Sequence, residues 1–550
     1  MNTRIVSWLI AIAAAILFIP FLGVVHLFDW DEINFAESAR EMLVTQDFAR
    51  VQIDFKPFWE KPPLFFWLQA ASMQVFGVNE FAARFPNAII GIITLVLIFN
   101  IGSKIYNPRF GLWWTLVYAG SLLPHFYFKS GIIDPLFNLF IFLGVYQMYL
   151  LTLHKQNKQR RRKVMWAGLF IGLGILTKGP VALLLSGLTV LVFWLLSRKW
   201  KTFRIVELLI FGLVSFVISS VWYLPETINN GIGFITKFID YQLDLASSTS
   251  TGHEQPIFYH PVVLLLGCFP ASVYFLGSFK RNAKDTGEQR RFKTWMKALF
   301  WVVLIVFSLI TTKIMHYSSM CYFPLTFMAA TYLFHIQEKQ IRFAKLLNIL
   351  IGLIGGLIAL LLAALPIAIQ YKDQLTPYIK DKFAVANLEA AVHWSGLESI
   401  IGFFLLGIVL TTLIYWNRKN PALGAQALFL SVLVTLQVLF YVFIPKIERY
   451  TQAAAIEFME SKQKEDCYVG TVGYKSYAQY FYTARTPDKS PKNNSEEWFL
   501  TGKTTKPVYL VTRIDRSQRL DSLQKAGFPI KKIGAKNGFV FFKRAANTGK

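Results

Sequence analysis

Acidic side chains follow directly after the first long apolar run of this sequence. Residues 9–27 are almost entirely apolar, and Asp29, Asp31 and Glu32 come next. A run of about 20 apolar residues can cross a bilayer, so we expect these acids at a membrane surface. Carboxylates placed there could act as general bases. The simpler interpretation is that Asp31 or Glu32 begins the next helix and stabilises its positive end.

A second charged pair, Glu60 and Lys61, stands immediately before Pro62 and Pro63. Prolines restrict their own backbone and that of the preceding residue, so the pair is expected at a rigid corner. A local salt bridge between the two side chains is the simpler explanation of the pair.

Further ionisable groups lie at the ends of other apolar runs. An ionisable residue in a membrane segment is costly and therefore suggests a function. Lysine can bind phosphate as a point charge, and carboxylates can serve as a general base or hold a cation. We predict one membrane face that receives a phosphate-bearing lipid and carries Asp31, Glu32, Glu60, Lys61, Asp134, Lys178, His253 and Lys313.

His253 lies in a polar stretch rich in Ser and Thr. It is interpreted either as a solvated loop histidine or as a metal ligand, and its type alone favours the first.

The composition is that of a polytopic membrane protein. The 550 residues are 54% hydrophobic and 16% aromatic, with a mean hydropathy of +0.42. The net charge of +25 comes from Lys and Arg in short loops between apolar runs, where they act as topology signals. Nucleic acid is therefore not expected as a partner. The three cysteines are far apart and have no metal-ligand or disulfide spacing.

The apolar runs predict the membrane spans that would position these groups. About thirteen spans are predicted, near 5–28, 86–103, 111–128, 132–153, 164–178, 180–197, 205–222, 261–279, 298–312, 317–336, 346–369, 398–416 and 423–444. Basic residues concentrate in alternate loops, which places the N-terminus in the cytoplasm and the residues after the last span outside. Residues 33–43 have helical spacing with Glu37, Arg40 and Glu41 on one side, so an amphipathic helix along the membrane interface is expected there.

The chain changes character after Pro445. Strand-like runs at 467–472, 508–512 and 538–542 flank a stretch of helical spacing at 517–525. We therefore predict a transmembrane domain over 1–444 and a small extracytoplasmic α/β domain over 445–550, with no catalytic motif in the second.

Taken in order, several short motifs resemble those of the GT-C glycosyltransferases. The similarity is to the transferases that add 4-amino-4-deoxy-L-arabinose to lipid A and, more distantly, to protein O-mannosyltransferases. It covers most of residues 1–330 and is carried by the stretches beginning at Asp31, Glu60, Lys178, His253 and Lys313.

The resemblance implies a polyprenyl-phosphate-linked sugar as donor, a lipid or protein as acceptor, and a place in the bacterial inner membrane. No nucleotide cofactor is expected, and the sequence has no Gly-rich nucleotide loop. By the resemblance Asp31 is the catalytic base, with Glu32 beside it, while Glu60 and His253 hold a divalent metal such as zinc. Lys61, Lys313 and Tyr317 contact the donor phosphate.

One departure concerns the long loop over 223–260. The family places an arginine there, but Lys237 is the only cation of this loop. Lys61, Lys178, Lys313 or Arg84 would then bind the donor phosphate instead, with Asp134 contacting substrate.

Two other classes of function stay open. Charged residues at span ends could line the path of a lipid transporter or flippase, although such carriers typically have inverted repeats and charges at the bilayer midplane. A non-catalytic assembly protein whose C-terminal part binds a partner is the third interpretation.

Overall fold

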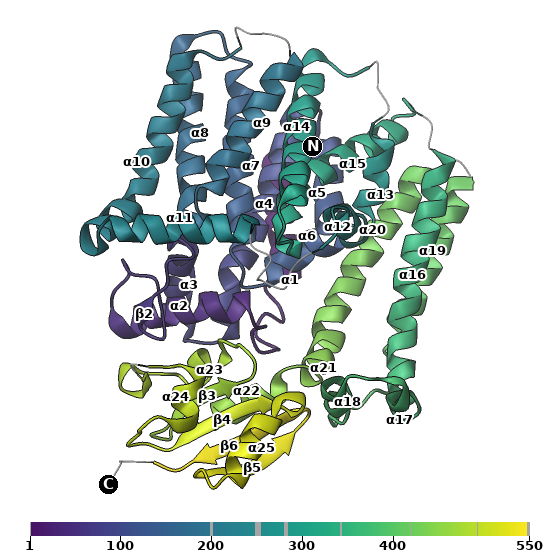
Figure 1. Cartoon of the computed structure of the whole chain (residues 1–550). Coiled ribbons are helices and arrows are strands. Elements are labelled where there is room, and N and C mark those ends of the chain that lie inside the picture. The colour runs from purple at the N-terminus through teal and green to yellow at the C-terminus, as the bar shows by residue number, and fades with distance from the viewer. Residues whose placement is uncertain are drawn as a thin grey trace.

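The computed structural model describes residues 2–197, 202–247, 255–279, 284–341, 344–417, 420–491 and 493–546. Long helices stand side by side in the upper part of Figure 1. Helices α2 (Asp31–Thr45) and α11 (Ile232–Ser247) lie across the lower end of this bundle, and a small sheet lies below them.

The first half of the chain is helical apart from one short hairpin, β1 (Gln52–Ile53) and β2 (Lys56–Pro57). Its helices are α1 (Thr3–Phe18), α2 (Asp31–Thr45), α3 (Leu64–Phe76), α4 (Glu80–Ile105), α5 (Pro108–Ala119), α6 (Leu122–Phe126), η1 (Tyr127–Lys129), α7 (Asp134–Leu151), α8 (Asn157–Lys178), α9 (Val181–Ser197), α10 (Ile205–Asn230) and α11 (Ile232–Ser247).

Helices continue to residue 449. They are α12 (Tyr259–Gly267), α13 (Ala271–Gly277), α14 (Gly287–Leu309), η2 (Met315–Cys321), α15 (Tyr322–Gln337), α16 (Lys345–Gln370), α17 (Lys372–Leu375), η3 (Thr376–Tyr378), α18 (Lys382–Leu388), α19 (Ser399–Asn417), α20 (Pro421–Val438), the π-helical turn η4 (Leu439–Phe443) and α21 (Ile444–Arg449).

Every predicted apolar run overlaps a helix, but the helices differ in length and continuity. Within the described ranges, six helices are long and apolar enough to cross a membrane: α4, α7, α10, α14, α16 and the continuous helix from Pro421 to Arg449. The pair α12 and α13 would add a seventh span, bent by 109°. The count of thirteen spans stays a prediction.

The first helix is shorter than the expected span over 5–28, because α1 ends at Phe18. Pro20 follows, and a proline cannot donate a helical hydrogen bond. The ammonium of Lys129, from η1, donates to the carbonyl oxygens of Leu17 at 3.0 Å and Pro20 at 2.8 Å. A buried lysine thus satisfies carbonyl groups that the end of the helix leaves free.

Helix α2 begins at Asp31, as predicted, but it is not an interfacial helix with a solvated polar face. All of its residues from Glu32 to Met42 are buried. Arg40 forms a two-pronged pair with Glu37 at 2.7 Å and donates to the carbonyl of Arg485 at 2.8 Å. The charged face is therefore covered by the C-terminal part of the chain, a contact that spacing along one helix could not reveal.

The C-terminal residues build a four-stranded sheet of order β3-β4-β6-β5. Strands β3 and β4 are parallel, and the other two pairings are antiparallel. Three strands and α25 coincide with the runs identified in the sequence. The elements are α22 (Ala453–Glu460), β3 (Tyr468–Val472), α23 (Ala478–Phe481), η5 (Pro487–Lys489), α24 (Glu496–Thr501), β4 (Val508–Arg513), η6 (Ile514–Arg516), α25 (Gln518–Lys525), β5 (Ile530–Lys536) and β6 (Phe539–Arg544).

Buried polar contacts join this sheet region to the β1–β2 hairpin. Arg485 donates to Asp54 at 2.9 Å, and Asn494 and Ser490 each donate to the same carboxylate at 2.7 Å. Glu41 of α2 accepts the backbone N–H of Asp54 at 2.6 Å. Since groups at 2% exposure must be paired to be stable, these contacts fix the sheet region against the helical part.

Candidate functional site

Several helix ends meet where α2 begins. The beginning of α7, the end of α8 and the turn η2 each bring a polar or charged side chain to this place. Asp134 lies at the positive N-terminal end of α7 and Lys178 at the negative C-terminal end of α8, which suits both charges.

Asp31 is the accessible carboxylate of this group, with a side chain that is 35% exposed. Its Oδ2 lies 3.8 Å from Nε2 of His316, and Nδ1 of the same ring lies 2.6 Å from the hydroxyl of Tyr127. Neither His316 nor Tyr127 was assigned a role from the sequence, although His316 belongs to the motif that starts at Lys313. An exposed carboxylate near an oriented imidazole can accept a proton from a bound hydroxyl group.

Glu32 has a different role from its neighbour, and the prediction that it is catalytic is not supported. Its carboxylate accepts two hydrogen bonds from Arg84, at 3.0 and 2.8 Å, and others from the backbone N–H groups of Phe28 and Gly131. Burial by itself would raise the pKa of Glu32, but Arg84 and these N–H groups lower it. Glu32 therefore stays ionised and shapes the segment before Asp31.

The geometry of Arg84 also argues against the prediction that it binds phosphate. Besides Glu32, its guanidinium donates to the carbonyl oxygens of Leu22, Val25 and His26 at 2.8 to 2.9 Å. An arginine has five N–H donors, and all five have protein partners here.

Lys61 has no ion-pair partner among the described residues. Its ammonium lies 5.1 Å from the ring centre of Tyr241. The negative charges of Glu60, Asp31 and Asp134 act on it and favour its charged form. Burial lowers its pKa, and the nearby charge of Lys178 lowers it further. The expected salt bridge between Glu60 and Lys61 does not form. An anion bound here would supply the partner that Lys61 lacks.

Lys178 and Asp134 form the close ion pair of the site, with Nζ 2.5 Å from Oδ1. The ammonium also lies 5.7 Å from the ring centre of Tyr317, which places this predicted phosphate contact beside the pair. Gly179 ends α8 with a φ of +101°, and a Cβ there would lie 3.1 Å from Phe238 of α11. Only glycine allows this turn without strain.

Helix α11 covers one side of the site. The hydroxyl of Tyr241 donates to Glu60 at 2.5 Å, and Lys237 lies 5.4 Å from the ring centre of Trp59. Tyr241 and Lys237 are therefore site neighbours that no motif had identified. His253 lies outside the described residues. Glu60 belongs to no group of three His, Cys, Asp or Glu side chains in the described ranges that could hold a metal ion, and a metal held by Glu60 and His253 stays a prediction.

Lys313 is buried, at 7% exposure, just before η2. Its positive charge acts on His260, and within the part of the chain that the structure describes it pairs with no carboxylate. The structure thus gives no direct contact between Lys313 and Asp31 or Lys61.

The C-terminal sheet region reaches the segment that carries Asp31. The backbone N–H of Tyr477 donates to Asp29 at 3.2 Å, and its ring packs edge-on against Trp30 at 4.9 Å. Burial raises the pKa of Asp29 to about 6. The hydroxyl of Tyr482 accepts the N–H of Leu27 at 2.6 Å. The C-terminal sheet region therefore fixes the position of residues 27–30 through these contacts.

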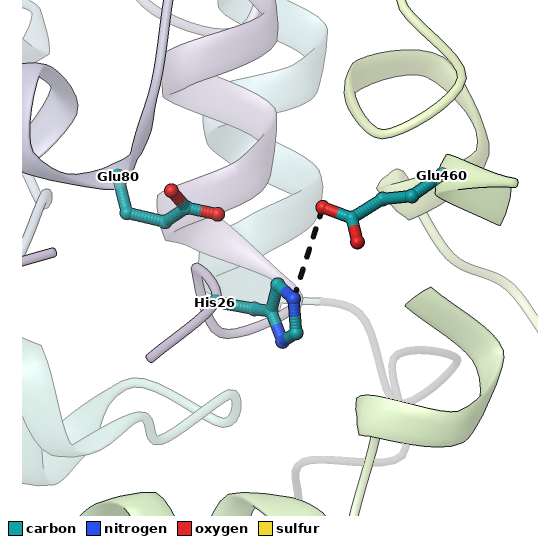
Figure 2. Close-up of side chains that lie close together, drawn as sticks. All are labelled: His26, Glu80 and Glu460. Atoms are coloured by element: carbon teal, nitrogen blue, oxygen red, sulfur yellow. Dashed lines mark ion pairs between the residues drawn. The ribbon is translucent and has the colours of Figure 1, made fainter. Parts of the chain in front are cut away.

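A second polar cluster lies just before this segment, where His26 faces Glu80 and Glu460 (Figure 2). His26 also contacts Glu448 at 2.9 Å and Glu460 at 3.8 Å. Burial opposes its charge, but the hydrogen bonds to Glu448 and Glu460 outweigh burial and raise the pKa of His26 to about 10. A protonated imidazole is thus the cation of this cluster and joins the end of the first segment to α22.

Comparisons with known proteins agree with the resemblance seen in the motifs. Residues 60–223 match the family described as dolichyl-phosphate-mannose-protein mannosyltransferase. The undecaprenyl phosphate-alpha-4-amino-4-deoxy-L-arabinose arabinosyl transferase of Edwardsiella ictaluri is 26% identical over 346 residues, 61% of each chain. That of Pectobacterium atrosepticum is 26% identical over 66% of each chain. The chain therefore aligns with somewhat less than two thirds of these relatives.

The fold matches over nearly the whole chain. ArnT from Cupriavidus metallidurans in the apo state superposes with a TM-score of 0.77 at 16% identity, covering 98% of both chains. The same protein bound to undecaprenyl phosphate gives a TM-score of 0.75. The chain thus has the fold of that protein and resembles glycosyltransferases that use a sugar linked to a polyprenyl phosphate.

Proposed function

We propose that this chain is an integral-membrane glycosyltransferase that moves a sugar from an undecaprenyl-phosphate-like donor to a lipid A-like glycolipid. The observation that carries the proposal is the meeting of Asp31, Lys61 and the Lys178–Asp134 pair at one end of the bundle. The arabinosyl transferase relatives and their fold support it, since their names specify an undecaprenyl phosphate donor.

The donor phosphate is assigned to the lysines. A sugar phosphodiester carries one negative charge, and breaking the bond from the sugar to the phosphate oxygen leaves a monoester with a second, developing charge. Lys61 lies close to Lys178 in a partly buried setting and has no carboxylate partner among the described residues. A fixed positive charge is worth more to the transition state than to the substrate when it faces the oxygen that gains charge.

Asp31 is assigned the proton of the acceptor. The acceptor oxygen attacks the anomeric carbon opposite the phosphate, its bond to that carbon forms as the carbon–phosphate oxygen bond breaks, and its proton passes to Asp31. This course inverts the anomeric configuration. His316, 3.8 Å from Asp31, is assigned to hold the carboxylate in place.

The proposed arrangement in the membrane follows the loop charges. The N-terminus lies in the cytoplasm of a bacterial cell, and the site with the C-terminal α/β domain over 445–550 lies on the periplasmic side. A protein acceptor is the alternative within the same reaction class, because the matched family is described as a protein mannosyltransferase.

The test is transfer from a lipid extract of the native host into membranes that contain the wild type, Asp31→Asn, Lys61→Ala or Arg109→Gln, with products identified by mass. Arg109 is an exposed cation in the first turn of α5, just beyond the end of α4, and serves as the control. We expect a sugar-sized mass gain in the acceptor that Asp31→Asn and Lys61→Ala lose and Arg109→Gln keeps. Full activity in Asp31→Asn at normal protein level would refute its role. Movement of the lipid across the bilayer without a mass gain would identify a flippase.

A further inference from the structure

A groove along α8 lies at the end of the bundle opposite to the candidate site. Lys178 ends α8 at the site, so the first turns of the helix are at the other end (Figure 1). The groove has a volume of about 770 Å³, and one face of α8 forms most of its wall, with Val214 of α10 on the opposite side.

Cations form the outer part of this wall. Lys158, Arg161 and Arg162 line the groove, and none of them has a carboxylate partner among the described residues. The adjacent Arg160 differs, because Glu207 binds it at 2.6 Å through two N–H groups. The charge of Arg160 is thus neutralised within the protein, whereas the groove presents three positive charges that are not.

Apolar side chains continue the same helical face. Met165, Trp166 and Leu169 follow the cations at intervals of three and four residues, which places them along one stripe. Met165 is 54% exposed and Trp166 is 42% exposed. Basic loop residues alone are explained by membrane topology. A hollow that is cationic at its rim and apolar along its length also matches the two parts of a phospholipid.

We propose that this groove binds an anionic glycerophospholipid from the membrane leaflet at that end. Its phosphate and headgroup lie against Lys158, Arg161 and Arg162, and its acyl chains follow Met165, Leu169 and Val214. Arginine pairs well with phosphate oxygens through its planar N–H groups, and basic pockets between membrane helices suit acidic lipid headgroups. This site is separate from the proposed reaction, which takes place at the other end of α8.

The experiment is native mass spectrometry of the full-length protein released from nanodiscs of phosphatidylglycerol or phosphatidylcholine. The test variant is Lys158→Gln/Arg161→Gln/Arg162→Gln. The control variant, Lys104→Gln/Arg109→Gln/Lys345→Gln, removes the same charge from exposed positions beyond the groove. Size-exclusion elution as a single symmetrical peak establishes that each variant is folded.

We expect wild type and control to retain at least one phosphatidylglycerol that the test variant loses about fivefold or more. Phosphatidylcholine should be retained equally weakly by all three. Glycerol phosphate, which lacks acyl chains, should not displace the retained lipid. Trp166→Ala should reduce the amount of phosphatidylglycerol that stays bound. Equal retention in the test and control variants would overturn the proposal, as would displacement by glycerol phosphate, which would assign the groove to a free phosphate compound.

Discussion

Asp31 and Glu32 are adjacent acids for which the structure leads to opposite expectations. Glu32 sits in a buried pair with Arg84 and accepts two backbone N–H groups, whereas Asp31 is 35% exposed and forms no such pair. Glu32→Gln removes the negative charge and leaves the guanidinium buried without its counter-ion. Removing one partner of a buried ion pair costs about 3–5 kcal/mol.

Asp31→Asn should instead leave stability within about 0.5 kcal/mol of wild type, as for most substitutions of accessible groups. Its transfer rate should fall about 10²–10⁴-fold, the usual contribution of a positioned general base. Both quantities can be measured on protein purified in detergent, with unfolding followed by denaturant titration and transfer by product mass.

A double-mutant cycle with Glu32→Gln and Arg84→Gln measures the interaction energy between these two side chains apart from their other contacts. The double variant should lose less stability than the two single variants added together, because neither charge is then left alone. If Glu32→Gln kept wild-type stability and lost transfer as completely as Asp31→Asn, the assignment of Glu32 to structure would be refuted.

Three further predictions concern groups around the site. Arg485→Ala should weaken the docking of the sheet region by about 3 kcal/mol, because the carboxylate of Asp54 would stay buried without its cation, and hydrogen exchange in the hairpin should rise. Because the pKa of His26 is raised to about 10, the charged imidazole stabilises the fold fully below pH 6.5, and this stabilisation is lost as the pH rises through about 10. The free energy of unfolding should therefore fall with pH between these two values, and His26→Ala should abolish that fall. Gly179→Ala should cost about 1–3 kcal/mol of stability and reduce transfer, since alanine disfavours a φ of +101° and its Cβ would press on Phe238; unchanged unfolding and transfer would contradict this.

Patterns along the sequence identified the helical part well, because apolar runs and the first turn of α2 are local features. Asp31, Lys61, Asp134 and Lys178 were also placed at one end of the bundle from loop charges and span order. The distinction between Asp31 and Glu32 could not be made in this way. Adjacent residues on a helix point about 100° apart, and only the position of Arg84, 52 residues later, decides which of the two is buried.

Contacts between distant segments account for the other differences. The charged face of α2 has the spacing of an interfacial helix, and its cover comes from residues near 485. Tyr241 and His316 reach the site because α11 and η2 pack there, and neither residue type is unusual in its local sequence. The carbonyl groups left free at the end of α1 are satisfied by Lys129, a residue more than a hundred positions away.

The contacts of residues 26–30 bear on membrane sidedness without any count of spans. The N–H of Leu27 is bonded to Tyr482 at 2.6 Å, and Asp29 accepts the N–H of Tyr477 at 3.2 Å. The sheet region and Asp31 must therefore lie at the same side of the membrane, whichever side that is. A miscounted span would move the sheet region and Asp31 together to the other side of the membrane. The groove of α8 would still lie on the side opposite to them. The sheet region and the segment that carries Asp31 thus have one common orientation in the membrane. The proposed reaction requires the donor phosphate to lie on that same side.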